Sequence, residues 1–114
     1  MALFLNGKQV VTVEDTECSV TLGSTMPSGT GKPSIVRTGS VVILNFGLQL
    51  PSGTYPTTQI LWNITPKPKK ATYGTVRWND GTINIVVNTD GTLRFNNQQT
   101  SNNHWIVGSI VYLA

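Results

Sequence analysis

The most informative part of this chain is its C-terminal stretch, His104-Trp-Ile-Val-Gly-Ser-Ile-Val-Tyr-Leu-Ala114. Successive side chains of a β-strand point to opposite faces. The two faces of this stretch are therefore His104, Ile106, Gly108, Ile110 and Tyr112 on one side, and Trp105, Val107, Ser109, Val111 and Leu113 on the other. Both faces are largely apolar, and a small domain has only one core. We therefore expect the second face to meet another layer or another subunit.

Short strand-like segments, separated by turn residues, account for the rest of the chain. The clearest is residues 40–50, where Val42, Leu44, Phe46, Leu48 and Leu50 alternate with more polar residues. No window favours a helix, because Gly, Pro and β-branched residues interrupt each one. The expected strands are residues 2–5, 8–13, 18–22, 34–37, 40–50, 59–65, 71–79, 82–88, 92–95 and 104–114.

Turn residues mark the connections between these strands. Asn6-Gly7, Thr38-Gly39 and Asp80-Gly81 indicate tight hairpins, and residues 51–56, 66–70 and 96–103 are expected to be loops. The sequence predicts an all-β fold, a compact antiparallel β-barrel or sandwich of about eight short strands with Greek-key or meander connections.

A length of 114 residues indicates one domain. The best linker is the stretch 23–33, which is rich in Gly, Ser and Pro. The expected organisation is therefore an N-terminal arm with strands and a linker loop at residues 1–33, followed by a β-barrel head at residues 34–114. The sequence leaves open whether the arm packs on the head.

Charge is scarce and unevenly distributed. Only 11% of the residues are charged, and three of the five acids, Glu14, Asp15 and Glu17, form a cluster. No acid occurs in residues 18–79, which contain six Lys and Arg residues. These cations indicate either a solvated basic loop or attraction to an anionic polymer, such as a cell-wall polysaccharide with phosphate groups. Nucleic acid is less favoured, because the cations gather mainly in one Pro-broken loop.

Cysteine content and hydropathy set further limits. Cys18 is the single cysteine, so no internal disulfide can form, and a structural thiol is the simplest role. The apolar start at residues 1–5 is too short for a signal peptide, and no segment is long enough to span a membrane. We expect a protein made in a cytoplasm without a cleavable export signal and without membrane insertion.

The sequence gives little support for catalysis. Glycosidases use two carboxylates across the scissile bond, whereas only Asp80 and Asp90 follow the N-terminal acidic cluster. Each of them precedes Gly, a pair typical of turns. His104 is the single histidine, which disfavours a zinc site. We therefore predict no catalytic residues, no metal and no cofactor, and a protein that is not an enzyme.

Saccharide binding requires fewer groups than catalysis does. An aromatic ring stacks on the C–H face of a sugar, while charged groups and amides bind its hydroxyls. Trp62 lies between Ile60 and Ile64 at period two, so we expect it in the core. The predicted ligand-binding residues are Trp78, Asp80, Arg94, His104 and Trp105.

Structural roles compete with this interpretation. Trp105 shares a strand face with Val107 and Val111, so core or interface contact is as reasonable as ligand contact. Trp78 ends its strand beside a turn, and ligand or subunit contact competes there with packing in the core. His104 also suits a hydrogen-bonded strand end.

From Arg37 to Ala114 the order of motifs has a family resemblance. The segments are Leu50-Pro-Ser-Gly-Thr-Tyr-Pro56, Trp78-Asn-Asp-Gly-Thr-Ile, Asn88-Thr-Asp-Gly-Thr-Leu93 and the terminal Ser109-Ile-Val-Tyr-Leu-Ala. This order resembles the C-terminal head domains of phage receptor-binding proteins of tail fibres and baseplates, most closely those of lactococcal siphophages. The resemblance implies a homotrimeric β-barrel head that binds host cell-wall saccharides, made in the host cytoplasm and carried at the phage tail tip or baseplate of the virion.

Two hypotheses follow from the residues and the resemblance together. The leading one is a non-catalytic adhesion head whose partners are a host cell-wall saccharide, further copies of itself and other phage baseplate or tail proteins. The alternative is a structural virion module of the baseplate or capsid-decoration type, in which residues 67–70 dock on an acidic protein. A depolymerase fragment is disfavoured by the scarcity of acids.

Overall fold

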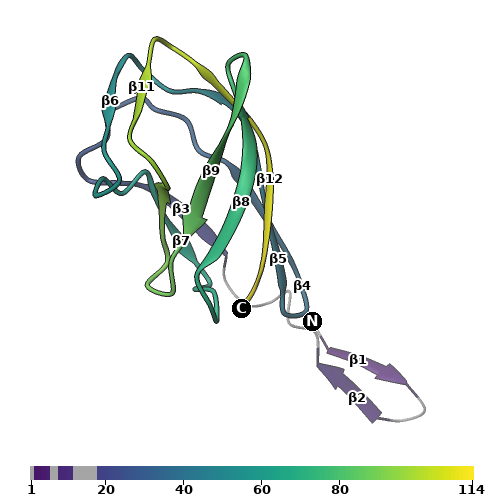
Figure 1. Ribbon diagram of the computed structural model, residues 1–114. Helices are drawn as coiled ribbons and strands as arrows, with labels where there is room; N and C mark the ends of the chain where they lie inside the picture. Colours follow the sequence, from purple (N-terminus) through teal and green to yellow (C-terminus); the bar gives the residue numbers. More distant parts are fainter. Residues whose placement is uncertain (1, 6–7, 12–17) are drawn as a thin grey trace.

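The computed structural model describes residues 2–5, 8–11 and 18–114, which form an all-β molecule (Figure 1). The strands are β1 (Ala2–Leu5), β2 (Lys8–Val11), β3 (Ser19–Leu22), β4 (Ser34–Thr38), β5 (Val41–Gln49), β6 (Gly53–Tyr55), β7 (Trp62–Thr65), β8 (Thr72–Trp78), β9 (Gly81–Val87), β10 (Thr92–Phe95), β11 (Gln99–Ser101) and β12 (Trp105–Leu113). In this part of the chain no helix is long and apolar enough to cross a membrane.

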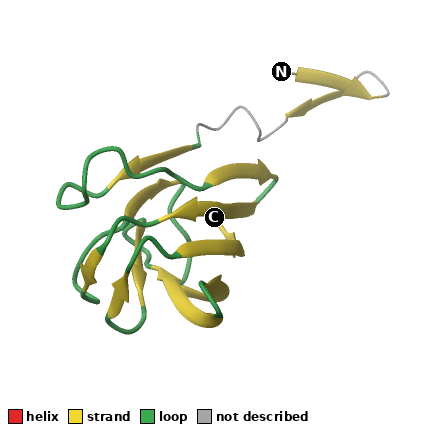
Figure 2. Cartoon of the chain, turned by 90° about the horizontal axis from the view of Figure 1, so that it is seen from above, coloured by secondary structure: helices red, strands yellow, loops and turns green. Residues whose placement is uncertain are grey.

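Eight of these strands form one antiparallel sheet in the order β3-β7-β10-β9-β8-β12-β5-β4. The two edge strands, β3 and β4, contact each other, so the sheet curves almost into a closed barrel (Figure 2). The C-terminal strand β12 lies between β5 and β8, and its nine residues all pair with β5. The prediction of a compact antiparallel all-β fold is confirmed.

Inward-facing side chains of these strands fill the barrel. Val42, Leu44, Phe46 and Leu50 are buried, and Leu48 packs against them, as the alternation in residues 40–50 predicted. The ring of Phe46 packs against Trp62, with centroids 5.8 Å apart. The Trp62 side chain is fully buried, and its Nε1 donates to the Gly31 carbonyl at 3.0 Å. The prediction that Trp62 belongs to the core is confirmed.

Two segments predicted to be loops contain short strands instead. β6 and β11 pair with each other in a separate two-stranded sheet, with Thr54 opposite Thr100. Three residues are too few to show an alternating pattern, and these strands are held by contacts distant in sequence. The buried Tyr55 ring packs edge-on against Phe95, and the buried Ser101 hydroxyl donates to the Leu50 carbonyl at 2.9 Å.

Two other boundaries differ from the sequence prediction. β7 begins at Trp62 rather than at residue 59, because Gln59 N donates to the Pro56 carbonyl and closes a turn. The turn after β8 lies at Asn79-Asp80, with Trp78 paired to Gly81, so it is one residue earlier than expected. Asn79 adopts a φ of 52°, a left-handed conformation that Asn tolerates better than most residues.

Residues 19–33 belong to the barrel rather than to a separate arm. β3 pairs with β7, with Val20 opposite Ile64, and Met26 lies in the core. β1 and β2 pair with each other in a two-stranded sheet of their own (Figure 1). The expected Asn6-Gly7 turn, the end of the strand predicted at residues 8–13 and the acidic cluster at Glu14, Asp15 and Glu17 fall outside the described residues.

Candidate functional site

The pairing of β8 with β12 brings four of the predicted ligand-binding residues to one end of the barrel. Trp78 at the end of β8 is opposite Ile106 near the start of β12. Asn79 N donates to the Trp105 carbonyl at 3.0 Å, so the turn that carries Asp80 lies beside His104 and Trp105. We refer to this region, defined by Trp78, Asp80, His104 and Trp105, as the barrel end.

Trp78 is a buried member of the barrel end. Its side chain is 7% exposed, because it points inward from β8 with Val76. Its indole ring packs edge-on against Phe95 at a centroid distance of 5.2 Å and against His104 at 5.1 Å. In this structure Trp78 offers no open ring face to a sugar, and it supports the imidazole of His104 instead.

The imidazole of His104 is half-buried and held by the preceding loop. Its Nδ1 accepts a hydrogen bond from Asn102 N at 3.2 Å, and its own backbone N donates to the Ser101 hydroxyl at 3.0 Å. A neutral imidazole that accepts at Nδ1 carries its proton on Nε2. His104 therefore has an Nε2–H donor that is not used in the part of the chain described.

Trp105 and Asp80 are the accessible members of the barrel end. Trp105 is 50% exposed, whereas Trp62 and Trp78 are buried. Asp80 is exposed in its turn, and its carboxylate has no hydrogen bond or ion pair within residues 18–114. Neighbouring residues of a strand point to opposite faces, so a ligand that contacts both His104 and Trp105 must lie across the rim of the barrel.

Arg94 lies elsewhere and takes part in a different network. It is opposite Val86 in the pairing of β10 with β9, and its guanidinium donates to Thr92 Oγ1 at 3.3 Å and to the Thr58 carbonyl. Asp90 Oδ1 accepts from Thr92 Oγ1 at 2.7 Å and from Thr92 N at 3.0 Å. These hydrogen bonds from Thr92 lower the pKa of the Asp90 carboxyl. Arg94 thus connects a turn and a loop, and the structure does not bring it to the barrel end.

An apolar surface extends from the barrel end along the outside of the sheet. It consists of every large hydrophobic side chain that is exposed in residues 18–114, namely Val36, Val41, Tyr73, Trp105, Val107, Val111 and Leu113. These residues lie on four neighbouring strands, β8, β12, β5 and β4. We call them the outer apolar face.

β12 divides its side chains between the core and the outer apolar face. Ile106, Ile110 and Tyr112 are buried, whereas Val107, Val111 and Leu113 are 42%, 51% and 56% exposed. The second face of the last strand therefore meets no other layer of the described chain. Exposed hydrophobic side chains on neighbouring strands make this face a candidate interaction surface.

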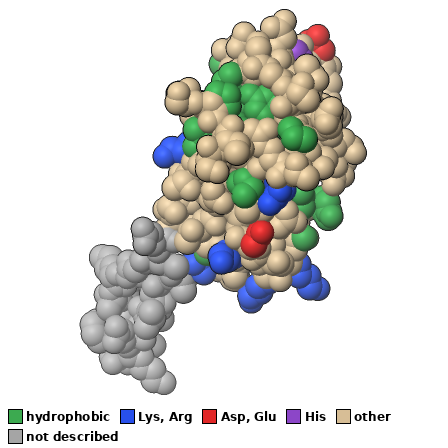
Figure 3. All heavy atoms as spheres, turned by 90° about the vertical axis from the view of Figure 1, so that its left-hand side faces the viewer, with side chains coloured by type: hydrophobic (Ala, Val, Ile, Leu, Met, Phe, Trp, Pro, Cys, Tyr) green, Lys and Arg blue, Asp and Glu red, His purple; other side chains and the backbone are tan. Residues whose placement is uncertain are grey.

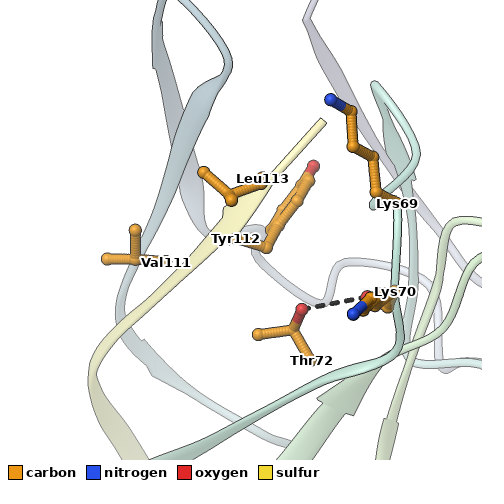
Figure 4. A pocket seen from close by; sticks show the side chains of 6 residues that line it. All are labelled: Lys69, Lys70, Thr72, Val111, Tyr112 and Leu113. Carbon is orange, nitrogen blue, oxygen red and sulfur yellow. Dashed lines mark hydrogen bonds between the residues drawn. The ribbon is translucent and has the colours of Figure 1, made fainter.

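A pocket of about 330 Å³ lies at the opposite end of β12 from Trp105 (Figure 4). Its lining residues are Lys69, Lys70, Thr72, Val111, Tyr112 and Leu113. Tyr112 is buried, and burial raises the pKa of its phenol to about 12. Figure 3 shows one side of the molecule, and most of the Lys and Arg side chains visible there lie in its lower half.

The basic loop, residues 66–70, is predicted by the sequence, whereas this pocket is not. Its apolar walls come from β12, some forty residues further along the chain, and no local pattern reveals that contact. No three His, Cys, Asp or Glu side chains gather into a metal-binding group within the described ranges.

Comparisons with protein-family models, curated proteins and solved structures gave no match for this chain.

Proposed function

We propose that this protein is a non-catalytic adhesion head that binds saccharides of a bacterial host cell wall, as the receptor-binding module of a phage tail tip or baseplate. The observation that supports it best is the position of Trp105. Its half-exposed ring belongs both to the barrel end and to the outer apolar face. A sugar site and a subunit contact would therefore meet at this residue.

The barrel end offers the groups that a pyranose requires. The Trp105 ring would stack on the apolar C–H face of the sugar. The Asp80 carboxylate accepts hydrogen bonds from hydroxyl groups, and His104 Nε2–H supplies a donor. All three side chains are carried on or beside paired strands, which limits the entropy lost on binding.

Self-association into a homotrimer is part of this proposal. It would remove much of the outer apolar face from water, which is favourable at about 25 cal/mol per Å² of apolar surface. It would also present several weak sugar sites at once, so that a multivalent cell wall is held far more tightly than a single saccharide. The resemblance to trimeric phage heads gives the number of copies.

The experiment is to measure binding to purified host cell walls and to their soluble saccharides. Trp105→Ala should weaken binding about five-fold or more per site, because stacking contributes about 1 kcal/mol. The matched control is Tyr73→Ala, which removes another exposed aromatic ring of the outer apolar face. Equal binding by both variants and the unaltered protein would contradict the proposal.

A structural virion module that binds another protein is the second candidate. The outer apolar face favours it, because a partner of a different sequence could cover these side chains as well as a second copy could. Specific capture of one baseplate or capsid protein, together with no binding to cell-wall saccharides, would decide for this candidate.

A further inference from the structure

We propose that the pocket between the β7–β8 loop and the end of β12 binds a sugar unit that bears an acid group, either a carboxylate or a phosphate. This inference is built on the proposed adhesion function and adds a second subsite to it. The pocket is remote from the barrel end, because Leu113 comes eight residues after Trp105, roughly 26 Å along β12.

The charge of the pocket selects an anion. Lys69 and Lys70 are both exposed at its rim, and none of the residues that line it is acidic. Each lysine ammonium has three donors, so either one can donate to the oxygens of a carboxylate or phosphate group. Figure 4 shows the two lysine side chains on one side of the pocket and β12 on the other.

The other polar groups of the pocket already have partners. The Tyr112 hydroxyl donates to the Pro66 carbonyl at 2.6 Å, and the Thr72 hydroxyl donates to the Lys70 carbonyl at 3.0 Å. A neutral sugar would therefore find few unused donors apart from the ammonium groups. A sugar with an acid group is also attracted by the positive charge of the lysines, and this difference provides the selectivity.

The walls and size of the pocket suit one sugar ring. β12 supplies the wall of the pocket opposite the lysines, through Val111, Tyr112 and Leu113 (Figure 4). A volume of about 330 Å³ is at the lower end of the range for small-molecule sites, which accommodates a single unit rather than an oligosaccharide. Neighbouring units of a polymer would extend outward over the surface.

Hydrogen bonds hold the basic loop against β12. Lys69 N donates to the Leu113 carbonyl at 2.9 Å, next to the bond between Tyr112 and Pro66. The backbone that carries the lysines is thereby fixed relative to the apolar wall, so the pocket is largely formed before a ligand arrives. Val111 and Leu113 also belong to the outer apolar face, which places the pocket at the border of the proposed subunit contact.

The test is an amide NMR titration of the full chain with glucuronic acid, glucose 6-phosphate and neutral glucose. We expect one or both acid probes to shift the amides of residues 69–72 and 111–113, and glucose to leave them unchanged. The tighter of the two acid probes shows whether the pocket prefers a carboxylate or a phosphate. Shifts of equal size with glucose, or no shifts at these residues with either acid probe, would contradict the proposal that the pocket binds an acid sugar.

A pair of double variants separates the pocket from general charge attraction. Lys69→Ala/Lys70→Ala should weaken binding of the acid probe about five- to thirty-fold, as expected for the loss of two exposed charge contacts. Lys32→Ala/Lys67→Ala removes the same charge from residues that do not line the pocket, and it should change binding less than two-fold. Equal weakening by the two pairs would refute a defined site.

Cell-wall binding distinguishes failure of this inference from failure of the adhesion proposal. Unchanged wall binding by Lys69→Ala/Lys70→Ala would reject the pocket and leave adhesion through the barrel end intact. An unaltered protein that ignores cell walls but still binds the acid probe at residues 69–72 would reject adhesion and support the pocket.

Discussion

The indole ring of Trp78 packs edge-on against the imidazole of His104, with ring centroids 5.1 Å apart and an interplanar angle of 62°. Sequence reasoning treated both residues as ligand contacts. The structure gives them different positions, because Trp78 is buried and only His104 reaches toward the rim. Trp78 therefore fixes the orientation of the histidine that the proposed sugar site uses.

Replacing Trp78 should destabilise the fold. Trp78→Ala is expected to lower the free energy of unfolding by about 3–5 kcal/mol, because it leaves a cavity beside Phe95. Trp78→Phe keeps an aromatic ring and should lower the free energy of unfolding by clearly less. Urea denaturation followed by circular dichroism measures both values. A Trp78→Ala protein as stable as the original would show that the ring is not part of the core.

The Asp90 carboxyl should contribute to the acid sensitivity of the fold. Hydrogen bonds from Thr92 lower its folded pKa, so its contribution is present above the unfolded pKa of about 3.9 and is lost as pH falls through the folded pKa. Asp90→Asn should reduce stability at pH 7 and remove part of the acid-dependent loss.

The measurement is the free energy of unfolding between pH 7 and pH 2, compared for the original protein and Asp90→Asn. Thr92→Val, which deletes the hydroxyl that donates to Asp90 Oδ1, should change the profile in the same direction. Parallel profiles for all three proteins would mean that the Asp90 contact does not stabilise the folded state.

A charged side chain on the outer apolar face should weaken self-association. Val107→Lys places a cation on the proposed contact at a residue that does not line the pocket, and burying it there should raise the dissociation constant at least about tenfold. Thr21→Lys is the matched control, because it adds the same charge to an exposed position of β3, outside that face. Sedimentation velocity over a range of concentrations compares the two, and identical profiles would place the contact elsewhere.

Local sequence patterns predicted those features that each strand determines by itself. The alternation in residues 40–50 identified the core side of β5, and period two around Trp62 identified a core residue. The burial of Trp78 depends on His104, which lies just before β12 and far along the chain, so its position at a strand end was compatible with either role. The Lys69–Lys70 pocket needed the same kind of information, since β12 supplies its apolar wall.

The faces of β12 show both the strength and the limit of such reasoning. Alternation correctly separated Ile106, Ile110 and Tyr112 from the more exposed set. It could not say whether the second set meets another layer of the same chain. That answer depends on how β4, β5 and β8 surround the last strand and leave its outer side uncovered.

The most direct test of the account is the mass of the native protein in solution, measured by light scattering during size-exclusion chromatography across a hundredfold range of concentration. We expect the mass of three chains, with protection of Val36 and Val107 from solvent labelling in the assembled state. The mass of one chain at every concentration, with these side chains fully accessible, would contradict it.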